Sequence, residues 1–200
     1  MEEKLKRIED LIKEEEYDKA IRLCDEVLAQ DENCAMAYCL KGDATFFGPL
    51  DEAEAIKLTT KALELDPTIA RAYYIRAISR SWSPNNRVEE LEMEDYNKAI
   101  EFDPTYSEAY LDRGRLKRDL GDIEGALADF NSSVEANTNN YEAYSERGNL
   151  RYKGKDYYGA LIDYEKALLI NPRLRSARDS RTNCYFKTGQ IWEGIKSLFR

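Results

Sequence analysis

Residues 107–140, SEAYLDRGRLKRDLGDIEGALADFNSSVEANTNN, are followed without a gap by residues 141–174, YEAYSERGNLRYKGKDYYGALIDYEKALLINPRL, and both segments have the same pattern. Each contains E-A-Y, then R-G, then G-A-L, and an aromatic residue stands four positions after the alanine of G-A-L. A period of 34 residues is typical of stacked-repeat proteins, in which a single repeat cannot bury its own apolar face. The sequence therefore predicts an array of helical repeats.

The same period extends over the whole chain of 200 residues. With 34% charged and 42% hydrophobic residues, and only 10 glycines and 5 prolines, the composition is typical of amphipathic helices. We therefore predict an all-α fold, a solenoid of helix-turn-helix repeats in a single array whose last repeat is incomplete. The predicted repeats are residues 1–34, 35–69, 70–106, 107–140, 141–174 and 175–200.

Small residues and aromatic rings recur at fixed positions of the repeats. Only glycine or alanine fits where two antiparallel helices cross closely, and large rings fill the wider gaps beside the crossing. The small residues are Gly42, Ala77, Gly114 and Gly148 on first helices and Ala20, Ala55, Ala126 and Ala160 on second helices. The rings are Tyr38, Tyr73, Tyr110, Tyr144, Tyr96, Phe130 and Tyr164. Asp51, Asp122 and Asp156 are expected to cap second helices, and Cys24 falls on a core position.

This pattern resembles the tetratricopeptide repeat (TPR) signature W-x2-L-G-x2-Y…A-x3-F…P, most closely in residues 35–69, 107–140 and 141–174. One departure is a basic residue before the small residue of each first helix, namely Lys41, Arg76, Arg113 and Arg147. We expect the stems of these side chains to pack while their charges reach water. The resemblance implies a right-handed superhelix with a concave groove lined by the first helices. It also implies a protein-binding or peptide-binding scaffold that is not an enzyme.

Residues 70–106 depart most from the repeat, because about three extra residues enter around positions 81–86. Glu92 stands where the other second helices have alanine. Burying an unpaired carboxylate is costly. We therefore expect the second helix to shift or rotate locally, so that Glu92 lies in water or pairs with a nearby arginine.

The geometry of the family places on the concave face those residues of each first helix that packing does not use. The expected peptide-binding groove consists of Arg71, Tyr74, Ile78, Trp82, Leu111, Arg115, Arg118, Ser145, Asn149, Tyr152, Asn183 and Phe186. This mixture of aromatic, arginine and amide side chains suits an extended peptide or an amphipathic helix. The Lys/Asn clamp with which some members of the family hold a terminal carboxylate is not supported, since only Asn149 fits it.

Several of these side chains have a second interpretation. Tyr74, Ile78, Tyr152 and Phe186 are as well explained by packing on the next repeat. Trp82 either belongs to a working face beside the insertion or lies under its own long loop. Arg115 and Arg118 either bind an acidic peptide segment or, as we favour, pair with the nearby carboxylates of Glu108, Asp112 and Asp119.

The composition argues against catalysis and cofactors. The chain has no histidine and its four cysteines form no C-x-x-C motif, so we expect no metal or other cofactor. Carboxylates at i, i+4, such as Glu108 with Asp112 and Glu142 with Glu146, recur between repeats and indicate exposed helix surface rather than a catalytic pair. We expect no enzyme activity.

The net charge of −9 lies entirely in residues 1–70, which carry 18 acidic and 9 basic side chains. An acidic protein repels a polyanion, so we expect no nucleic acid partner. We expect no membrane partner either, because no long apolar run is present. Free thiols favour the cytoplasm.

The last repeat ends inside its second helix, which would leave Ile195, Leu198 and Phe199 without a covering helix. Either the natural chain continues, or this edge packs on a partner or on another copy. Residues 173–200 also carry seven basic side chains against two acidic ones. The alternative function is therefore a self-assembling module, in which this edge meets the acidic first third of another copy in a homo-oligomer.

Overall fold

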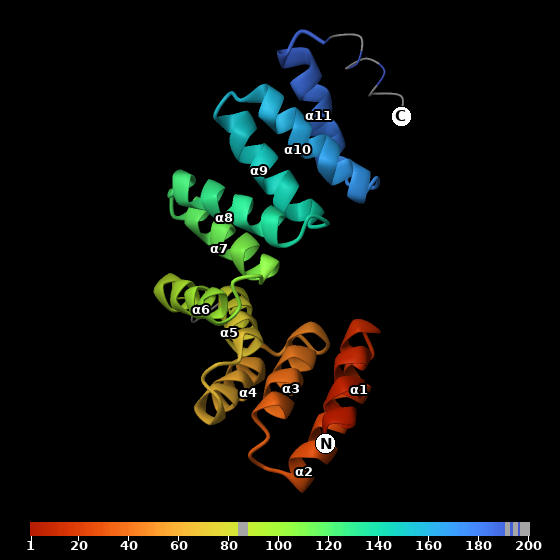
Figure 1. Ribbon diagram of the computed structural model, residues 1–200, viewed down its shortest axis with the longest axis vertical. Helices are drawn as coiled ribbons and strands as arrows, with labels where there is room; N and C mark the ends of the chain where they lie inside the picture. The colour runs from red at the N-terminus through yellow and green to blue at the C-terminus, as the bar shows by residue number, and fades with distance from the viewer. Residues whose placement is uncertain (84–87, 191–192, 194–195, 197–200) are drawn as a thin grey trace. The chain divides into compact units, whose positions relative to one another are not determined.

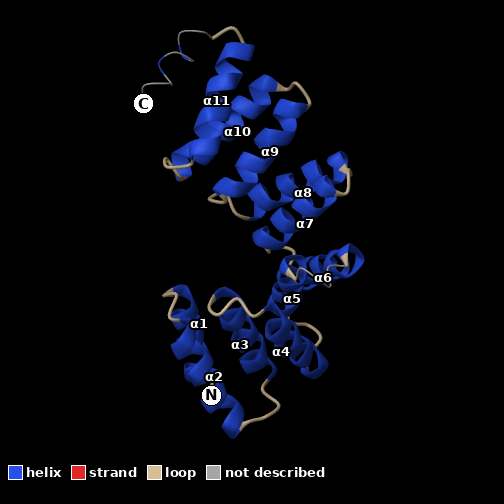
Figure 2. Ribbon diagram, turned by 180° about the vertical axis from the view of Figure 1, so that it is seen from behind, coloured by secondary structure: helices blue, strands red, loops and turns tan. Residues whose placement is uncertain are grey.

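The computed structural model describes residues 1–83, 88–190, 193 and 196. These residues form eleven α-helices connected by turns, and they contain no strand (Figure 1, Figure 2). The helices are α1 (Glu2–Lys13), α2 (Tyr17–Gln30), α3 (Ala35–Phe47), α4 (Glu52–Leu65), α5 (Ala70–Trp82), α6 (Glu89–Phe102), α7 (Ser107–Asp119), α8 (Ile123–Ala136), α9 (Tyr141–Lys153), α10 (Tyr157–Ile170) and α11 (Arg175–Lys187).

The chain has two compact units, which we call the N-terminal unit (Met1–Pro104) and the C-terminal unit (Thr105–Arg200). The N-terminal unit contains the helix pairs α1–α2, α3–α4 and α5–α6, and the C-terminal unit contains α7–α8, α9–α10 and α11. The predicted all-α fold of repeated helix hairpins is confirmed. Ile195, Leu198 and Phe199, which were expected to form an uncovered edge, lie outside the described residues, as does Pro84 of the insertion.

The paired helices cross closely at the predicted glycines. A Cβ atom added to Gly114 would lie 2.7 Å from the Phe130 ring, and one added to Gly148 would lie 3.0 Å from the Tyr164 ring. At Gly42 the same atom would lie 2.8 Å from the Thr59 methyl group. The small residue is therefore a steric requirement of each crossing.

The second helices begin at the predicted caps. The side chains of Asp51, Asp122 and Asp156 each accept a hydrogen bond from the backbone N–H three residues later, at 2.9 Å in every case. Such a cap satisfies one of the unpaired N–H groups at a helix start and contributes about 1 kcal/mol. The sequence thus encodes both the position and the start of these helices.

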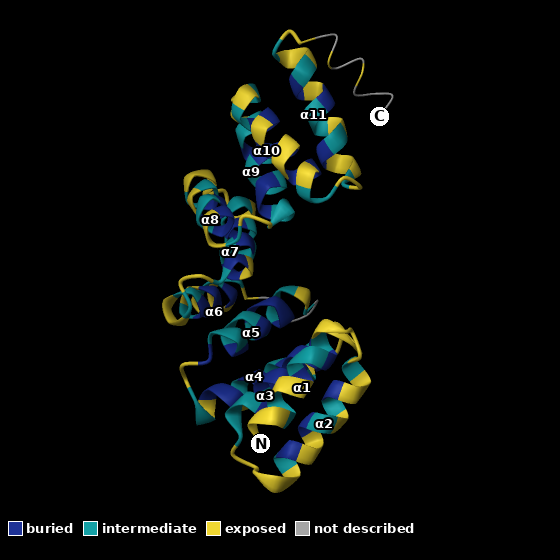
Figure 3. Cartoon of the chain, turned by 45° about the vertical axis from the view of Figure 1, so that its right-hand side comes forward, coloured by how far each residue is buried: buried dark blue, intermediate teal, exposed yellow. Residues whose placement is uncertain are grey.

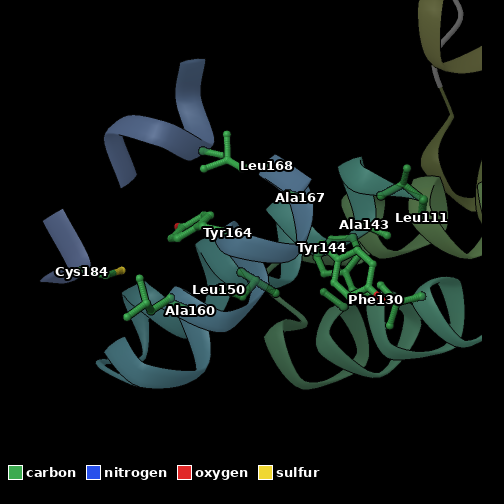
Figure 4. Packing of buried hydrophobic residues seen from close by; sticks show 14 residues of the cluster. Leu111, Phe130, Ala143, Tyr144, Leu150, Ala160, Tyr164, Ala167, Leu168 and Cys184 are labelled. Carbon is green, nitrogen blue, oxygen red and sulfur yellow. The ribbon is translucent and has the colours of Figure 1, made fainter. Parts of the chain in front are cut away.

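Each unit has its own apolar core. In the C-terminal unit the rings of Phe130, Tyr144 and Tyr164 pack among aliphatic side chains from successive helices (Figure 4). In the N-terminal unit, a cluster around Ile8 and Leu40 includes Cys24, which is fully buried as the sequence predicted.

The basic residues before the small residues do not reach water as expected. Arg113 donates two hydrogen bonds, of 2.9 and 2.7 Å, to Asp129 on its own second helix, and its side chain is only 15% exposed. Arg147 binds Asp163 in the same way, with its closest contact at 2.6 Å. Arg76 donates bonds of 2.9 and 2.6 Å to Asp95. The predicted exposure of these three charges is therefore wrong, and each of these three repeats contains a buried bidentate ion pair.

A second cation completes each of these ion pairs. It comes from the next turn of the first helix, four residues after the first cation. Lys117 lies 2.9 Å from Asp129, Arg151 lies 2.8 Å from Asp163, and Arg80 pairs with Asp95. Each buried aspartate is therefore shared by two cations, which compensates for its removal from water.

Glu92 is buried, with 1% of its surface exposed, although it lies in the first turn of α6. The prediction that it lies in water is wrong, and the alternative of an arginine partner is supported by its interaction with the charge of Arg80. Burial lowers the pKa of Arg80, while Asp95 and Glu92 act in the opposite direction. The N-terminal unit thus buries an additional carboxylate beside the cations that hold Asp95.

Candidate functional site

The sequence-predicted site residues lie on the first helices α5, α7, α9 and α11. Within each unit these helices form a row, because α3 contacts both α1 and α5, and α9 contacts both α7 and α11. Side chains on such a row can touch those of the neighbouring repeat.

In the N-terminal unit, aromatic side chains gather at the C-terminal ends of α3 and α5. The Phe46 and Trp82 rings meet edge to face with their centroids 6.2 Å apart, and the Phe46 and Phe47 rings do so at 5.0 Å. Phe46 is buried, whereas Trp82 is 63% exposed and Phe47 is also exposed. The Trp82 ring is thus accessible to solvent, and we call these three residues the aromatic site.

Arg71 links the first helices of the N-terminal unit through ion pairs. Its Nε donates a hydrogen bond of 2.6 Å to Asp43 on α3, and its guanidinium lies 3.9 Å from Glu9 on α1. Burial raises the pKa of Asp43, while the charge of Arg71 acts in the opposite direction. Arg71 therefore stabilises a buried carboxylate of the preceding repeat.

The two remaining candidates on α5 contribute mainly to packing. Ile78 is buried, and the half-buried Tyr74 ring lies 6.3 Å from the Tyr96 ring of α6. Of the four α5 candidates, Trp82 alone is exposed by more than a third of its surface.

In the C-terminal unit, Arg115 and Arg118 of α7 bind carboxylates of α9. Arg115 donates hydrogen bonds to Glu142 at 2.7 Å and to Glu146 at 3.1 Å, and Arg118 donates one to Glu146 at 2.6 Å. Asp112 and Asp119 accept further bonds from these arginines, both at 3.0 Å. The favoured interpretation, pairing with nearby carboxylates, therefore holds for Asp112 and Asp119.

These carboxylates stabilise the protonated, positively charged form of Arg115. Burial acts to lower the pKa of Arg115, but the hydrogen bond to Glu142 and the charges of Asp112 and Glu146 raise it above its usual value. Glu142 and Glu146 were expected to be exposed helix surface. Both are half-buried, because they hold the arginines of the neighbouring repeat.

The other candidates of the C-terminal unit differ in exposure. Leu111 is buried in the core, and Asn149 accepts a hydrogen bond of 2.9 Å from the Tyr164 hydroxyl. Tyr152 meets the Tyr157 ring edge to face, with centroids 5.3 Å apart. The remaining three are the half-buried Ser145 and the exposed Asn183 and Phe186. The exposed candidates of this unit therefore lie on α11, and those of α9 are half-buried.

Sequence reasoning missed two features of these surfaces. Phe47 joins the aromatic site, and the paired phenylalanines 46 and 47 at the end of a first helix were a signal for it. The acidic i, i+4 pair on α9 also matches the basic i, i+3 pair on α7. That match was visible in the sequence once the two helices were assumed to lie side by side.

The described part of the chain offers little to a metal ion or to nucleophilic chemistry. Among the residues that the structure describes, no three histidine, cysteine, aspartate or glutamate side chains are grouped so that they could hold a metal. Burial raises the pKa of Cys24 and of Cys39 to about 12 and that of Cys184 to about 11.

None of the helices within the described ranges is both long and apolar enough to span a membrane.

Comparison with known families gives a match over residues 95–128, which fit the model of the tetratricopeptide repeat. Together with the helix pairs and their glycine crossings, this match decides the fold. The chain has the tetratricopeptide repeat fold. The resemblance seen in the sequence is thereby confirmed.

Solved structures of TPR proteins superpose on most of the chain. YrrB, "a TPR protein with an unusual peptide-binding site", is 21% identical, covers 87% of this chain and 88% of its own, and gives a TM-score of 0.62. TTC0263, a thermophilic TPR protein from Thermus thermophilus, is 18% identical over 92% of this chain and 98% of its own, with a TM-score of 0.71. PilW, a type IV pilus biogenesis factor, is 17% identical over 97% of this chain and 88% of its own, with a TM-score of 0.76. The search among curated proteins gives no match.

Proposed function

We propose that this TPR protein is a non-catalytic scaffold or adaptor that binds a peptide segment of a partner protein on its first helices. The observation that carries the proposal is Trp82, a tryptophan that is 63% exposed yet held edge to face by Phe46. Large aromatic side chains held rigidly at a surface contribute most to binding energy at protein interfaces. The peptide-binding site named for YrrB, which shares the fold, supports the same use of the repeats.

The aromatic site favours an apolar or aromatic side chain of the peptide as its anchor. Trp82 and Phe47 present exposed ring surface, and the buried Phe46 fixes the orientation of both. Burying apolar surface contributes about 25 cal/mol per Å². An apolar anchor therefore supplies most of the affinity, and the polar groups of α5 serve its orientation.

The arginines of the proposed groove play a smaller part. Arg71, Arg115 and Arg118 already bind carboxylates of their own chain, so an acidic peptide has to compete with these internal partners. In the C-terminal unit, Tyr152, Asn183 and Phe186 offer the more accessible contacts. We infer that peptide affinity there depends on aromatic and amide contacts rather than on charge.

The proposal that the protein is not an enzyme is supported by its buried cysteine thiols and by the carboxylates of α9. The raised pKa of each buried cysteine keeps its thiol protonated, which is the opposite of an activated nucleophile. The carboxylates at i, i+4 on α9 hold arginines instead of facing each other for proton transfer. Four free cysteines also support a reducing compartment, which we take to be the cytoplasm.

The proposal is tested by selecting peptides from a displayed random library on the wild-type protein and measuring their Kd with two variants. Trp82→Ala removes the exposed anchor, and we expect Kd to rise at least about tenfold. Phe102→Ala is the matched control, because Phe102 is an exposed ring of the same unit on a second helix. Equal binding by the wild type and Trp82→Ala, or a library from which no peptide is enriched, would refute the aromatic site.

A further inference from the structure

The outer face of α10 carries three large apolar side chains in contact with solvent. Tyr158 and Ile162 are each 61% exposed, and Leu169 is 74% exposed. Figure 3 shows exposed segments recurring along α10. They stand four and seven residues apart, so they share one side of the helix. We call these residues the α10 stripe.

No other described second helix has such a stripe. When these helices are aligned on the residue at the crossing with the first helix, the three stripe positions hold only charged residues or alanine, and all of them are exposed or half-buried. These residues are Asp18, Arg22 and Ala29 in α2, Ala53, Lys57 and Glu64 in α4, Glu90, Glu94 and Glu101 in α6, and Glu124, Ala128 and Glu135 in α8. The repeat itself therefore does not require apolar residues here, and the α10 stripe needs its own explanation.

Two opposite charges stand in the middle of the stripe. Exposed lysines on other second helices pair with a carboxylate three residues away, as Lys57 does with Glu54 and Lys98 with Glu101. Lys166 has Asp163 at that distance, but Asp163 is already bound by two arginines. Within the described ranges, Lys166 has no ion pair, and the neighbouring Glu165 accepts a hydrogen bond of 2.7 Å from the Tyr185 hydroxyl.

When the α10 helices of two copies lie antiparallel, the stripe and the two charges of one copy match those of the other. With a two-fold axis between positions 165 and 166, Ile162 faces Leu169 of the second copy, and Glu165 faces Lys166 of the second copy. Each contact occurs twice, as a two-fold interface requires. Ile162 and Leu169 are about 10 Å apart along the helix, so both apolar pairs flank the charges within four turns.

We propose that the protein forms a two-fold homodimer through the outer face of α10. The charge of the C-terminal unit favours this contact, since residues 105–200 carry 14 acidic and 16 basic side chains, whereas residues 1–104 carry 25 and 14. Two copies therefore meet at this face with little net repulsion. The contact uses no residue of the aromatic site or of the proposed peptide-binding groove, so substitutions in it leave the proposed peptide contacts in place.

The size of the stripe sets the strength of the contact. One face of a 14-residue helix buries less than the roughly 800 Å² per partner of a stable complex. The dimer is therefore weak, and the fraction of the protein that is dimeric rises with protein concentration. It has to be measured up to about 500 µM.

The first experiment is sedimentation equilibrium of the full chain over this range. The weight-average mass of the wild type should rise from 23.2 kDa toward twice that value. Ile162→Asp should stay monomeric at every concentration, while Ala128→Asp, which places the same carboxylate at the same position of α8, should behave as the wild type. A wild type that stays monomeric, or an Ile162→Asp variant that still dimerises, would overturn the proposal.

The second experiment tests the orientation by exchanging charges. Glu165→Lys and Lys166→Glu each place like charges opposite one another, and each should raise the Kd about tenfold or more. The double exchange should restore the wild-type Kd, and an equimolar mixture of the two single variants should form the heterodimer in preference. If the double exchange fails to restore dimerisation, the antiparallel contact is wrong. Peptide binding should be unchanged in every variant.

Discussion

The helix crossings α9–α10 and α3–α4 have the same backbone arrangement but different contents. At α9–α10, Gly148 faces the Tyr164 ring, and Arg147 binds the buried Asp163 beside it. At α3–α4, Gly42 faces Thr59, whose hydroxyl donates to the Ala55 carbonyl at 2.7 Å. The close approach of the helices is thus the constant feature of the fold, and the buried charges are not.

The contrast extends to the cation before the glycine. Leu58 occupies in α4 the position that Asp163 has in α10, so Lys41 has no carboxylate at that place and binds Asp25 of the preceding repeat at 2.6 Å. Arg147 reaches the preceding repeat as well, donating a hydrogen bond of 2.9 Å to Asn131 while it binds Asp163. The ion pair therefore links the helices within one repeat, whereas the lysine links two repeats.

The largest effect is expected when the α9–α10 ion pair is broken. Asp163→Ala leaves Arg147 and Arg151 beside a buried site without their carboxylate, which should lower the free energy of unfolding by about 3–5 kcal/mol. Urea denaturation measures this loss. A triple change of Arg147, Arg151 and Asp163 to leucine removes all three charges and should recover most of it. A loss below about 1 kcal/mol for Asp163→Ala would contradict the role of the ion pair.

Filling the glycine crossings should have the next largest effect. Gly114→Ala places a methyl group 2.7 Å from the Phe130 ring, and we expect a net loss of about 1–2 kcal/mol after the gain in helix propensity. Gly148→Ala, with a 3.0 Å approach, should lose less. The same urea experiment ranks the two variants, and the reverse order would show that the crossing is not limited by these contacts.

Turns between paired helices offer a smaller, stabilising change. Leu50 and Lys155 have φ values of 57° and 66°, in the left-handed region that Gly121 occupies in its own repeat. Leu50→Gly and Lys155→Gly should each raise the free energy of unfolding by about 1 kcal/mol, and Gly121→Ala should lower it by a similar amount. The midpoint of thermal unfolding should rise for the two glycine substitutions and fall for Gly121→Ala. Destabilisation by both glycine substitutions would contradict this account of the turns.

The smallest effect is expected where ion pairs lie between repeats near the surface. Glu146→Gln weakens the bonds from Arg115 and Arg118, which are partly exposed, and should cost less than about 1 kcal/mol. In 0.5 M salt the Debye length is roughly half its physiological value, so the cost of Glu146→Gln should shrink further. The cost of Asp163→Ala should persist, because salt screens buried pairs much less. Equal salt dependence of the two variants would remove the distinction between surface and buried pairs.

The sequence was sufficient to predict the helices, the glycine crossings and the aspartate caps. These depend on contacts within one repeat, and two regular repeats showed which positions packing uses. The buried ion pairs were missed, although Asp129 and Asp163 each stand three residues after the alanine at the crossing. Recognising them requires knowing that this position faces the arginine across the helix pair.

The candidate site was predicted less well than the fold, because exposure depends on neighbouring repeats. Ile78 and Leu111 are buried, and the partners of Arg115 on α9 belong to the following repeat. Trp82 was selected for its place at the insertion, but its surroundings also include Phe46 on α3 of the preceding repeat. A one-dimensional pattern specifies the row of first helices and does not specify which side chains on it are free to bind.

The central claim, that the first helices bind a peptide at the aromatic site, is tested most directly by the fluorescence of Trp82. The chain has two tryptophans, so a Trp192→Phe protein reports on Trp82 alone. Titration with a selected peptide should shift its emission to shorter wavelength and saturate at the independently measured Kd, because the peptide covers the exposed ring. Binding that saturates while the Trp82 emission stays unchanged would contradict the claim.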